Sequence, residues 1–216
     1  MDALVSTVGT SLLTNCINTA PDVFTPADNA LIKANFNAVQ STPALNELLG
    51  RVQAYLAVNS AAYINTAELN TIRKYAHRMT GTASVKVPDT DYVFLATHTV
   101  LGLFCANQLA EYVRTEVVDM DVNVKHINQF QVDATDALDT GWRNLCELLD
   151  NIHRTYRADV LYNVTGGYKL LTGLTQSYAS NRGSRVMYTF EGDSPLVIID
   201  VNTIGTHPEI TFYQDR

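Results

Sequence analysis

A lysine follows a pair of glycines late in the chain, and these residue types at this spacing could bind an anion. Gly166 and Gly167 come shortly after the apolar run 160–164, and Lys169 stands two residues further on. The run predicts a buried strand, and the glycines allow a sharp turn with close backbone approach. Lys169 then falls in the first turn of a helix, where the helix dipole disfavours a cation. Backbone N–H groups and an ammonium would therefore converge on an anion such as phosphate.

A second turn of the same form lies near the start of the chain. Residues 3–8 predict a strand, and Gly9, Thr10 and Ser11 follow as a turn of small residues that supplies two hydroxyls. In a parallel sheet both turns lie at the carboxyl ends of strands, where open α/β sheets bind their ligands. Either turn alone is a weak signal, because glycines punctuate any α/β fold and Thr or Ser often only caps a helix. The pair of turns favours a functional interpretation.

The two turns resemble the signatures of CRISPR-associated Rossmann-fold (CARF) proteins. The residues that carry the resemblance are 5–15 and 163–169. They are closest to the branch that contains ring nucleases and the sensor domains of Csm6- and Csx1-like effectors. The resemblance implies a homodimer that binds cyclic oligoadenylate, usually cyclic tetra-adenylate, in a pocket across its two-fold axis. Some members of the family also cut that ring.

A ring nuclease of this kind needs no metal, because each ribose 2′-OH of the ligand can attack the adjacent phosphorus once it is held in line. We expect Lys169 to stabilise the charge of the phosphorane-like transition state, and Ser11 with Thr10 to orient the ribose or the scissile phosphate. The products would be linear di-adenylates that end in 2′,3′-cyclic phosphate, and type III CRISPR signalling would be switched off. Ser11 and Lys169 are the expected catalytic residues. The expected ligand-binding residues are Gly9, Thr10, Thr97, His98, Thr165, Gly166, Gly167 and Tyr168.

Two other functions stay open. The same residues would serve a sensor that binds cyclic oligoadenylate without cutting it and regulates a separate or fused effector. We favour the enzyme because the sequence shows no output domain: the Arg-x4–6-His motif of effector ribonucleases is not matched by Arg73 and His77, which are too close together. An unrelated Rossmann-like enzyme that acts on another nucleotide is the third alternative.

Other chemistries find little support in the sequence. It contains neither a Gly-x-x-x-x-Gly-Lys-Ser/Thr nor a Gly-x-Gly-x-x-Gly pattern, so a nucleoside triphosphatase or NAD enzyme is not expected. The sequence contains five histidines but neither a His-Glu-x-x-His nor a Cys-x-x-Cys motif. We therefore expect no metal and no cofactor. His98 alone is placed to reach a ligand, just past an expected strand, although a capping or surface histidine is the more common case.

The composition of the chain argues against DNA and membranes as binding partners. The formal net charge of -7 argues against a protein that coats DNA with a broad basic face, although a small anionic ligand needs only local positive potential. The cysteines Cys16, Cys105 and Cys146 lie far apart in apolar helical contexts, which predicts core thiols in a reducing cytoplasm. No stretch approaches the roughly 18 apolar residues of a membrane span.

The expected fold is α/β, with a Rossmann-like, mostly parallel sheet flanked by helices and an antiparallel C-terminal hairpin. A single CARF-like domain spans residues 1–216, and residues 201–216 form an extension that could add residues 209–213 to a sheet edge or cross to a partner subunit. A helix is expected from Thr25 to Val39, and another from Ala67 with Met79 on its inward face. The expected strands are 3–8, 91–97, 121–127, 160–164, 186–190 and 196–200.

Overall fold

Seven strands form one mixed sheet in the computed structural model, which describes residues 2–130, 135–156, 159–190, 194–200 and 209–213. The spatial order of the strands is β3-β2-β1-β4-β5-β6-β7, parallel from β3 to β5 and antiparallel from β5 to β7. This arrangement confirms the predicted Rossmann-like sheet with its antiparallel hairpin. Part of the hairpin loop, residues 191–193, lies outside the described residues. The strands are β1 (Asp2–Thr7), β2 (Thr90–Ala96), β3 (Val122–His126), β4 (Val160–Asn163), β5 (Arg185–Thr189), β6 (Leu196–Asp200) and β7 (Glu209–Tyr213).

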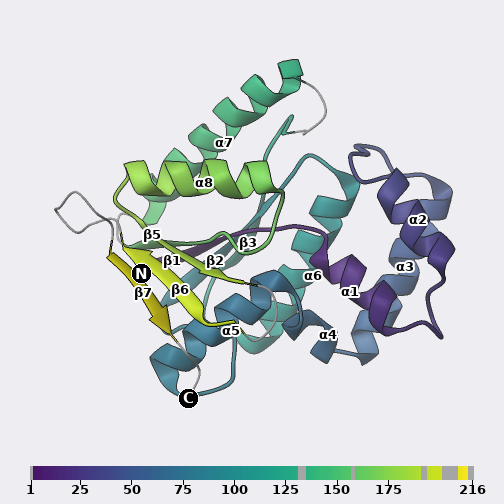
Figure 1. The fold of residues 1–216 in the computed structure, drawn as a ribbon, viewed down its shortest axis with the longest axis horizontal. Helices are drawn as coiled ribbons and strands as arrows, with labels where there is room; N and C mark the ends of the chain where they lie inside the picture. The colour runs from purple at the N-terminus through teal and green to yellow at the C-terminus, as the bar shows by residue number, and fades with distance from the viewer. Residues whose placement is uncertain (1, 131–134, 157–158, 191–193, 201–208, 214–216) are drawn as a thin grey trace.

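Helices cover both faces of the sheet (Figure 1). Two of them, α7 and α8, pack on one face, and the others gather on the opposite face and beside it. None of the described helices combines the length and the apolar character that a bilayer crossing needs. The helices are α1 (Ser11–Thr19), α2 (Pro26–Ala34), α3 (Pro43–Val58), α4 (Ala61–Ile64), α5 (Ala67–Thr80), α6 (Val100–Glu116), α7 (Thr135–Tyr156) and α8 (Lys169–Asn181).

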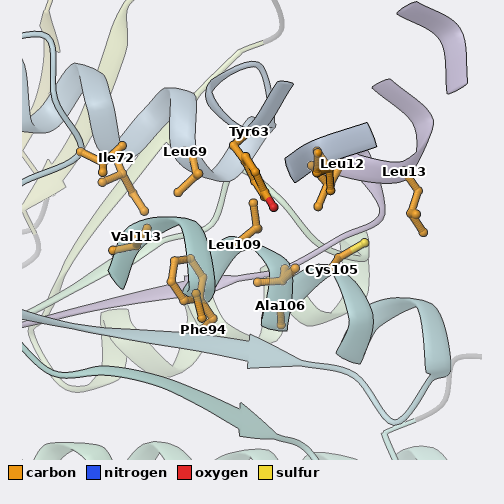
Figure 2. Packing of buried hydrophobic residues seen from close by; sticks show 14 of the residues in the cluster. Leu12, Leu13, Tyr63, Leu69, Ile72, Phe94, Cys105, Ala106, Leu109 and Val113 are labelled. Carbon is orange, nitrogen blue, oxygen red and sulfur yellow. The ribbon is translucent and has the colours of Figure 1, made fainter. Parts of the chain in front are cut away.

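The larger core lies between the sheet and helices α1, α3, α5 and α6 (Figure 2). On α6, apolar side chains recur at helical spacing and are fully buried; they are Leu101, Cys105, Leu109 and Val113. Phe94 of β2 packs beneath them. Each buried side chain of this size contributes roughly 1.5–3 kcal/mol, so this layer fixes α5 and α6 against the strands.

Two details of the helical region differ from the prediction. The helix expected to reach Val39 ends at Ala34, where the side-chain amide of Asn35 donates to the carbonyl of Leu31 (2.8 Å). An amide that bonds its own backbone in this way favours a helix end. Met79, expected to face inward, is 56% exposed, because the buried face of α5 ends one turn before its left-handed C-cap at Gly81.

The strand order places a topological switch point between β1 and β4. From β1 the chain moves outward to β2 and then β3, and it returns through α7 to β4 on the other side of β1. In open α/β sheets the crevice outside the carboxyl ends of such strands is the usual ligand site. The turns after β1 and β4 are the two glycine turns that the sequence singles out.

Candidate functional site

The two glycine turns lie against each other. A Cβ atom built on Gly9 would stand 2.8 Å from the backbone nitrogen of Gly167, so a side chain has no room there. Gly167 has a φ of +107°, a conformation that favours glycine. The hydroxyl of Thr7, at the end of β1, donates to the carbonyl of Gly166 and lies 3.3 Å from that of Asn163. The backbone after β1 and the backbone after β4 therefore form one tightly packed unit.

A buried carboxylate stands at this unit. One oxygen of Glu68, Oε1, accepts the Gly9 N–H (2.8 Å), and the other, Oε2, accepts the Ser11 hydroxyl (2.8 Å). Glu68 lies in the first turn of α5, where the helix dipole favours an acid, and its side chain is 0% exposed. Burial raises the pKa of its carboxyl, and the bonds from Gly9 and Ser11 oppose that rise. Gly9 is one of the expected ligand-binding residues, and in the structure its N–H donates to a carboxylate oxygen of the protein.

Asn163, the last residue of β4, fixes the start of α5 beside the turns. Its side-chain amide donates to the backbone carbonyl of Glu68 (3.0 Å) and to the hydroxyl of Ser6 on β1 (3.1 Å). Its Oδ1 accepts the N–H of Thr165 (3.2 Å). Asn163 is itself fully buried. Because it connects β1, β4 and α5, it keeps the Glu68 carboxylate in register with Ser11.

A polar cavity of about 330 Å³ opens beside this unit, and Ser11 and Thr165 both reach it. Its lining comes from both turns, from the start of α5 and from the end of β5. The Thr165 hydroxyl also accepts the N–H of Thr189 (3.1 Å) and lies 2.9 Å from the hydroxyl of the buried Thr71. The lining residues are Ser11, Asn15, Asn65, Ala67, Asn70, Thr165, Thr189 and Phe190. Hydroxyls and amides dominate, so the cavity suits a polar, hydrogen-bonding ligand.

Lys169 is the first residue of α8, as predicted, and its side chain is exposed. Its ammonium pairs with no carboxylate among the residues that the structure describes. The preceding residue, Tyr168, points toward the loop after α2: its hydroxyl lies 3.1 Å from both the carbonyl of Phe36 and the Oδ1 of Asn37. The Tyr168 ring also packs on the ring of Phe36, with centroids 4.7 Å apart. Tyr168 thereby anchors the turn that presents Lys169.

The residues after β2 stand apart from the Ser11 cavity. Thr97 is buried, and its hydroxyl lies 3.0 Å from that of Thr99. His98 lines a separate cavity of about 320 Å³ against α6, where its ring lies 4.6 Å from that of His126. Its Nδ1 accepts the N–H of Gln129 (3.0 Å). The structure thus brings Ser11 and Thr165 together at one cavity and places His98 at another.

Among the described residues, no group of three or more histidine, cysteine, aspartate or glutamate side chains lies close enough to hold a metal ion. The cysteines are free thiols, with Cys16 and Cys105 buried and Cys146 half-buried. Burial raises the pKa of Cys16 to about 11, so this thiol stays protonated near neutral pH. The site chemistry that the described residues offer is therefore that of hydroxyls, amides, one buried carboxylate and an exposed ammonium.

Comparison with known proteins decides the family. The model of a CRISPR-associated protein family, Cas_APE2256, matches residues 63–201. The chain belongs to this family. The matched range contains Glu68, Thr165 and the turn that leads to Lys169. The match confirms the CRISPR association that the resemblance of the two turns predicts.

Several solved structures match this CRISPR-associated chain. One of them is Enterococcus italicus Csm6 bound to cyclic hexa-2′-fluoro-hexa-dAMP, with 14% sequence identity and a TM-score of 0.45. The similarity covers 88% of this chain and 34% of that chain, so this chain spans about a third of the length of that protein. No curated protein matches this CRISPR-associated chain.

Glu68 is the site residue that sequence reasoning missed in this CRISPR-associated protein. Its position in the sequence indicates only a helix start after Thr66, because an acid in the first turn is common there. The contact with Gly9 joins residues 59 positions apart, and no local pattern reports it. The presence of a glycine at position 166 is the one signal of this contact in the sequence. A Cβ atom there would stand 2.0 Å from Oε1 of Glu68, so only glycine leaves room for the carboxylate. The first glycine of the pair leaves space for a carboxylate.

The raised pKa of Glu68 has a consequence for stability. The unfolded chain releases this proton near the ordinary value of 4.5, and the folded chain releases it at higher pH. Between the two values the folded state binds more protons, so its stability falls as pH rises, by about 1.4 kcal/mol for each pH unit. Urea denaturation of the wild type and of Glu68→Gln gives the difference between their free energies of unfolding. This difference, wild type minus variant, should be constant below about pH 4 and should decline above it. A difference that rises with pH would contradict the assignment.

Proposed function

We propose that this CRISPR-associated protein is a metal-independent ring nuclease that binds and cleaves cyclic oligoadenylate, with cyclic tetra-adenylate as the expected ligand. The observation that carries the proposal is the contact between the two glycine turns at the switch point, beside a cavity lined by Ser11 and Thr165. Membership of a CRISPR-associated family and the resemblance of both turns to CARF signatures support the choice of ligand. Cleavage would switch off type III CRISPR signalling.

The reaction uses a nucleophile that the ligand itself carries. A ribose 2′-oxygen forms a bond to the adjacent phosphorus, and its proton passes to a base. The bond from phosphorus to the 5′-oxygen of the next nucleotide breaks, and that oxygen takes a proton from solvent. The products are linear adenylates with a 5′-hydroxyl at one end and a 2′,3′-cyclic phosphate at the other. The protein holds the 2′-oxygen in line and stabilises the phosphorane-like charge.

The phosphate is held on the α8 side of the site. Lys169 offers an exposed ammonium at the first position of α8. Among the described residues the N–H groups of Gly166 and Gly167 form no hydrogen bond, and the proposal assigns them to phosphate oxygens. An anion at this point also meets the positive end of the helix dipole. Ser11 and Thr10 at the start of α1, together with Thr165 in the turn after β4, would contact the sugar.

A homodimer completes the site in this proposal. Cyclic tetra-adenylate has rotational symmetry, and a two-fold dimer presents Ser11 and Lys169 twice around it. The loop after α2 that contacts Tyr168 would then face the ring from each subunit. Light scattering of the protein at micromolar concentration should give a dimer mass, and a monomer that binds the ring with full affinity would contradict this part of the proposal.

The test of the proposal is direct. Labelled cyclic tetra-adenylate is incubated with the protein and excess chelator, with the ligand in molar excess, and the products are separated by chromatography. We expect linear products with 2′,3′-cyclic phosphate ends and slow multiple turnover. Intact ligand that nevertheless co-elutes with the protein would instead identify a sensor. Failure to bind any cyclic oligoadenylate would reject both functions.

The sensor alternative is favoured by one observation. Two polar groups expected to act on the ligand, the Gly9 N–H and the Ser11 hydroxyl, are already satisfied by Glu68. A rigid, satisfied pocket can recognise a ligand without in-line geometry for attack. Parent cyclic tetra-adenylate that stays intact through many hours on the protein would support this alternative.

A further inference from the structure

We propose that Glu68 directs the Ser11 hydroxyl so that Ser11 accepts a hydrogen bond from the ribose 2′-OH, and that Glu68 takes up the proton which leaves that hydroxyl. The inference rests on the proposed cleavage of cyclic oligoadenylate. It assigns the base of the reaction, for which the sequence offers no candidate. Glu68 acts through Ser11 and is therefore a positioning residue.

The donor pattern around Glu68 fixes its orientation. The Gly9 N–H can only donate, so Oε1 of Glu68 must be an acceptor (2.8 Å). The other oxygen, Oε2, accepts the Ser11 hydroxyl at 2.8 Å. The carboxylate is fully buried, and Gly166 packs against it so closely that it has no room to turn aside. The Glu68 carboxylate is therefore held in one orientation with both of its donors.

The direction of the Ser11 hydroxyl follows from this arrangement. A hydroxyl has one hydrogen to donate, and Ser11 gives it to Glu68. Only lone pairs of Oγ remain for the cavity that Ser11 lines, so the ligand atom that meets Ser11 must be a donor. A ribose 2′-OH is a donor, whereas a phosphodiester oxygen is only an acceptor. Ser11 is therefore suited to the 2′-hydroxyl, the nucleophile of the reaction, and not to a phosphate oxygen.

Charge and composition of the cavity agree with this assignment. The negative charge on Glu68 repels a phosphate near Ser11 and leaves the phosphate to Lys169 on α8. The described lining residues are neutral, and Asn15, Asn65 and Asn70 line the same cavity as Ser11, where their amides can bond a sugar or a base. In this assignment the turn after β1 holds the 2′-hydroxyl and the turn after β4 holds the phosphate, which would position the 2′-oxygen against the phosphorus.

The proton can follow the existing hydrogen bonds. As the 2′-oxygen bonds to phosphorus, its proton moves to Oγ of Ser11 while the Ser11 proton moves to Oε2 of Glu68. Glu68 becomes a neutral carboxylic acid, a form that its buried position tolerates well. The 5′-oxygen leaves with a proton from solvent, and Glu68 returns its proton to solvent through Ser11 after product release.

The test uses Glu68→Gln and a matched pair of ligands. A glutamine is nearly isosteric, and its oxygen must face the Gly9 N–H, so its NH₂ group donates to Ser11 and turns the Ser11 hydrogen toward the cavity. We expect cleavage of cyclic tetra-adenylate to fall about 10²-fold in kcat, with KM changed less than threefold. The wild type should bind the parent ring about tenfold tighter than its 2′-fluoro analogue, which cannot donate, and Glu68→Gln should lose or reverse that preference.

The controls separate this inference from the proposed function. Glu147→Gln removes an exposed carboxylate on α7, across the sheet, and should leave both the rate and the ligand preference unchanged. A Glu68→Gln protein that cleaves at the wild-type rate, or keeps the preference for the 2′-hydroxyl, would overturn the inference while the ring nuclease stands. A wild type that cuts no ring overturns the proposed function. Should Glu68→Gln fail to fold, Ser11→Ala must remove both cleavage and preference, and retention of either also overturns the inference.

Discussion

Replacement of Lys169 by alanine is expected to slow cleavage of cyclic tetra-adenylate by about 10²–10³-fold, the cost of removing one group that stabilises transition-state charge. Lys169 is exposed at the first position of α8, where a cation opposes the helix dipole. Its removal should therefore leave the fold intact and even stabilise α8 by about 0.3–1 kcal/mol. Single-turnover rates with saturating protein measure the loss directly, and thermal unfolding measures the stability.

The control for Lys169→Ala is another exposed lysine. Lys86 is exposed in the segment before the amino end of β2, whereas the glycine turns lie at the carboxyl ends of β1 and β4. Lys86→Ala changes the net charge by the same amount as Lys169→Ala. Its cleavage rate should equal that of the wild type. Equal losses in both variants would trace the effect to general attraction between the protein and an anionic ring. An unchanged rate in Lys169→Ala would remove the ammonium from the reaction and favour the sensor.

The sequence predicts those parts of the fold and site whose signals are local. The apolar run before Gly166 is a strand, the glycines form the turn, and Lys169 begins the helix, because each depends on a few neighbouring residues. The closeness of the two turns was also foreseeable, since parallel strands place their carboxyl ends at one edge. Helix starts at Pro26, Pro43 and Ala67 follow from their N-cap residues in the same way.

The parts that the sequence could not supply depend on contacts between distant segments. The position of Glu68 requires that α5 return to the β1 turn, and this packing arises from the apolar layer that α5 shares with α6. His98 also lies just past the carboxyl end of a strand, β2. Its ring nevertheless packs beside His126 and lines a different cavity, next to α6. Strand-end position alone therefore identifies an edge of the sheet but not which side chains meet there.

Glu68 changes what the site is able to do. A glycine turn that leaves its N–H groups free is an anion site, and the turn after β4 keeps that character. The turn after β1 does not offer these donors to an anion, because its Gly9 N–H and Ser11 hydroxyl both donate to the buried Glu68 carboxylate. In the proposed function, the turn after β4 would bind the phosphate and the turn after β1 would bind a hydroxyl donor. A substrate that carries a hydroxyl next to a phosphodiester would then meet both turns.

The second large effect is expected from Gly166→Ala. An added Cβ would stand 2.0 Å from Oε1, 2.3 Å from Cδ and 2.6 Å from Cγ of Glu68, so the carboxylate must leave its place. Overpacking of this kind costs about 1–3 kcal/mol, and the Ser11 contact would be lost with it. Urea denaturation should show the lower free energy of unfolding, and cleavage should fall at least as far as in Glu68→Gln.

Gly173→Ala is the matched control for Gly166→Ala, because Gly173 lies on the exposed side of α8 with nothing within 4 Å of an added Cβ. That change should stabilise the protein by about 0.5–1 kcal/mol through helix propensity. A double-mutant cycle then identifies the cause. Glu68→Ala removes the three atoms that the new Cβ would meet, so Gly166→Ala should cost little in a Glu68→Ala background. A cost that stays the same in both backgrounds would mean that Gly166 is required for the turn itself and not for the carboxylate behind it.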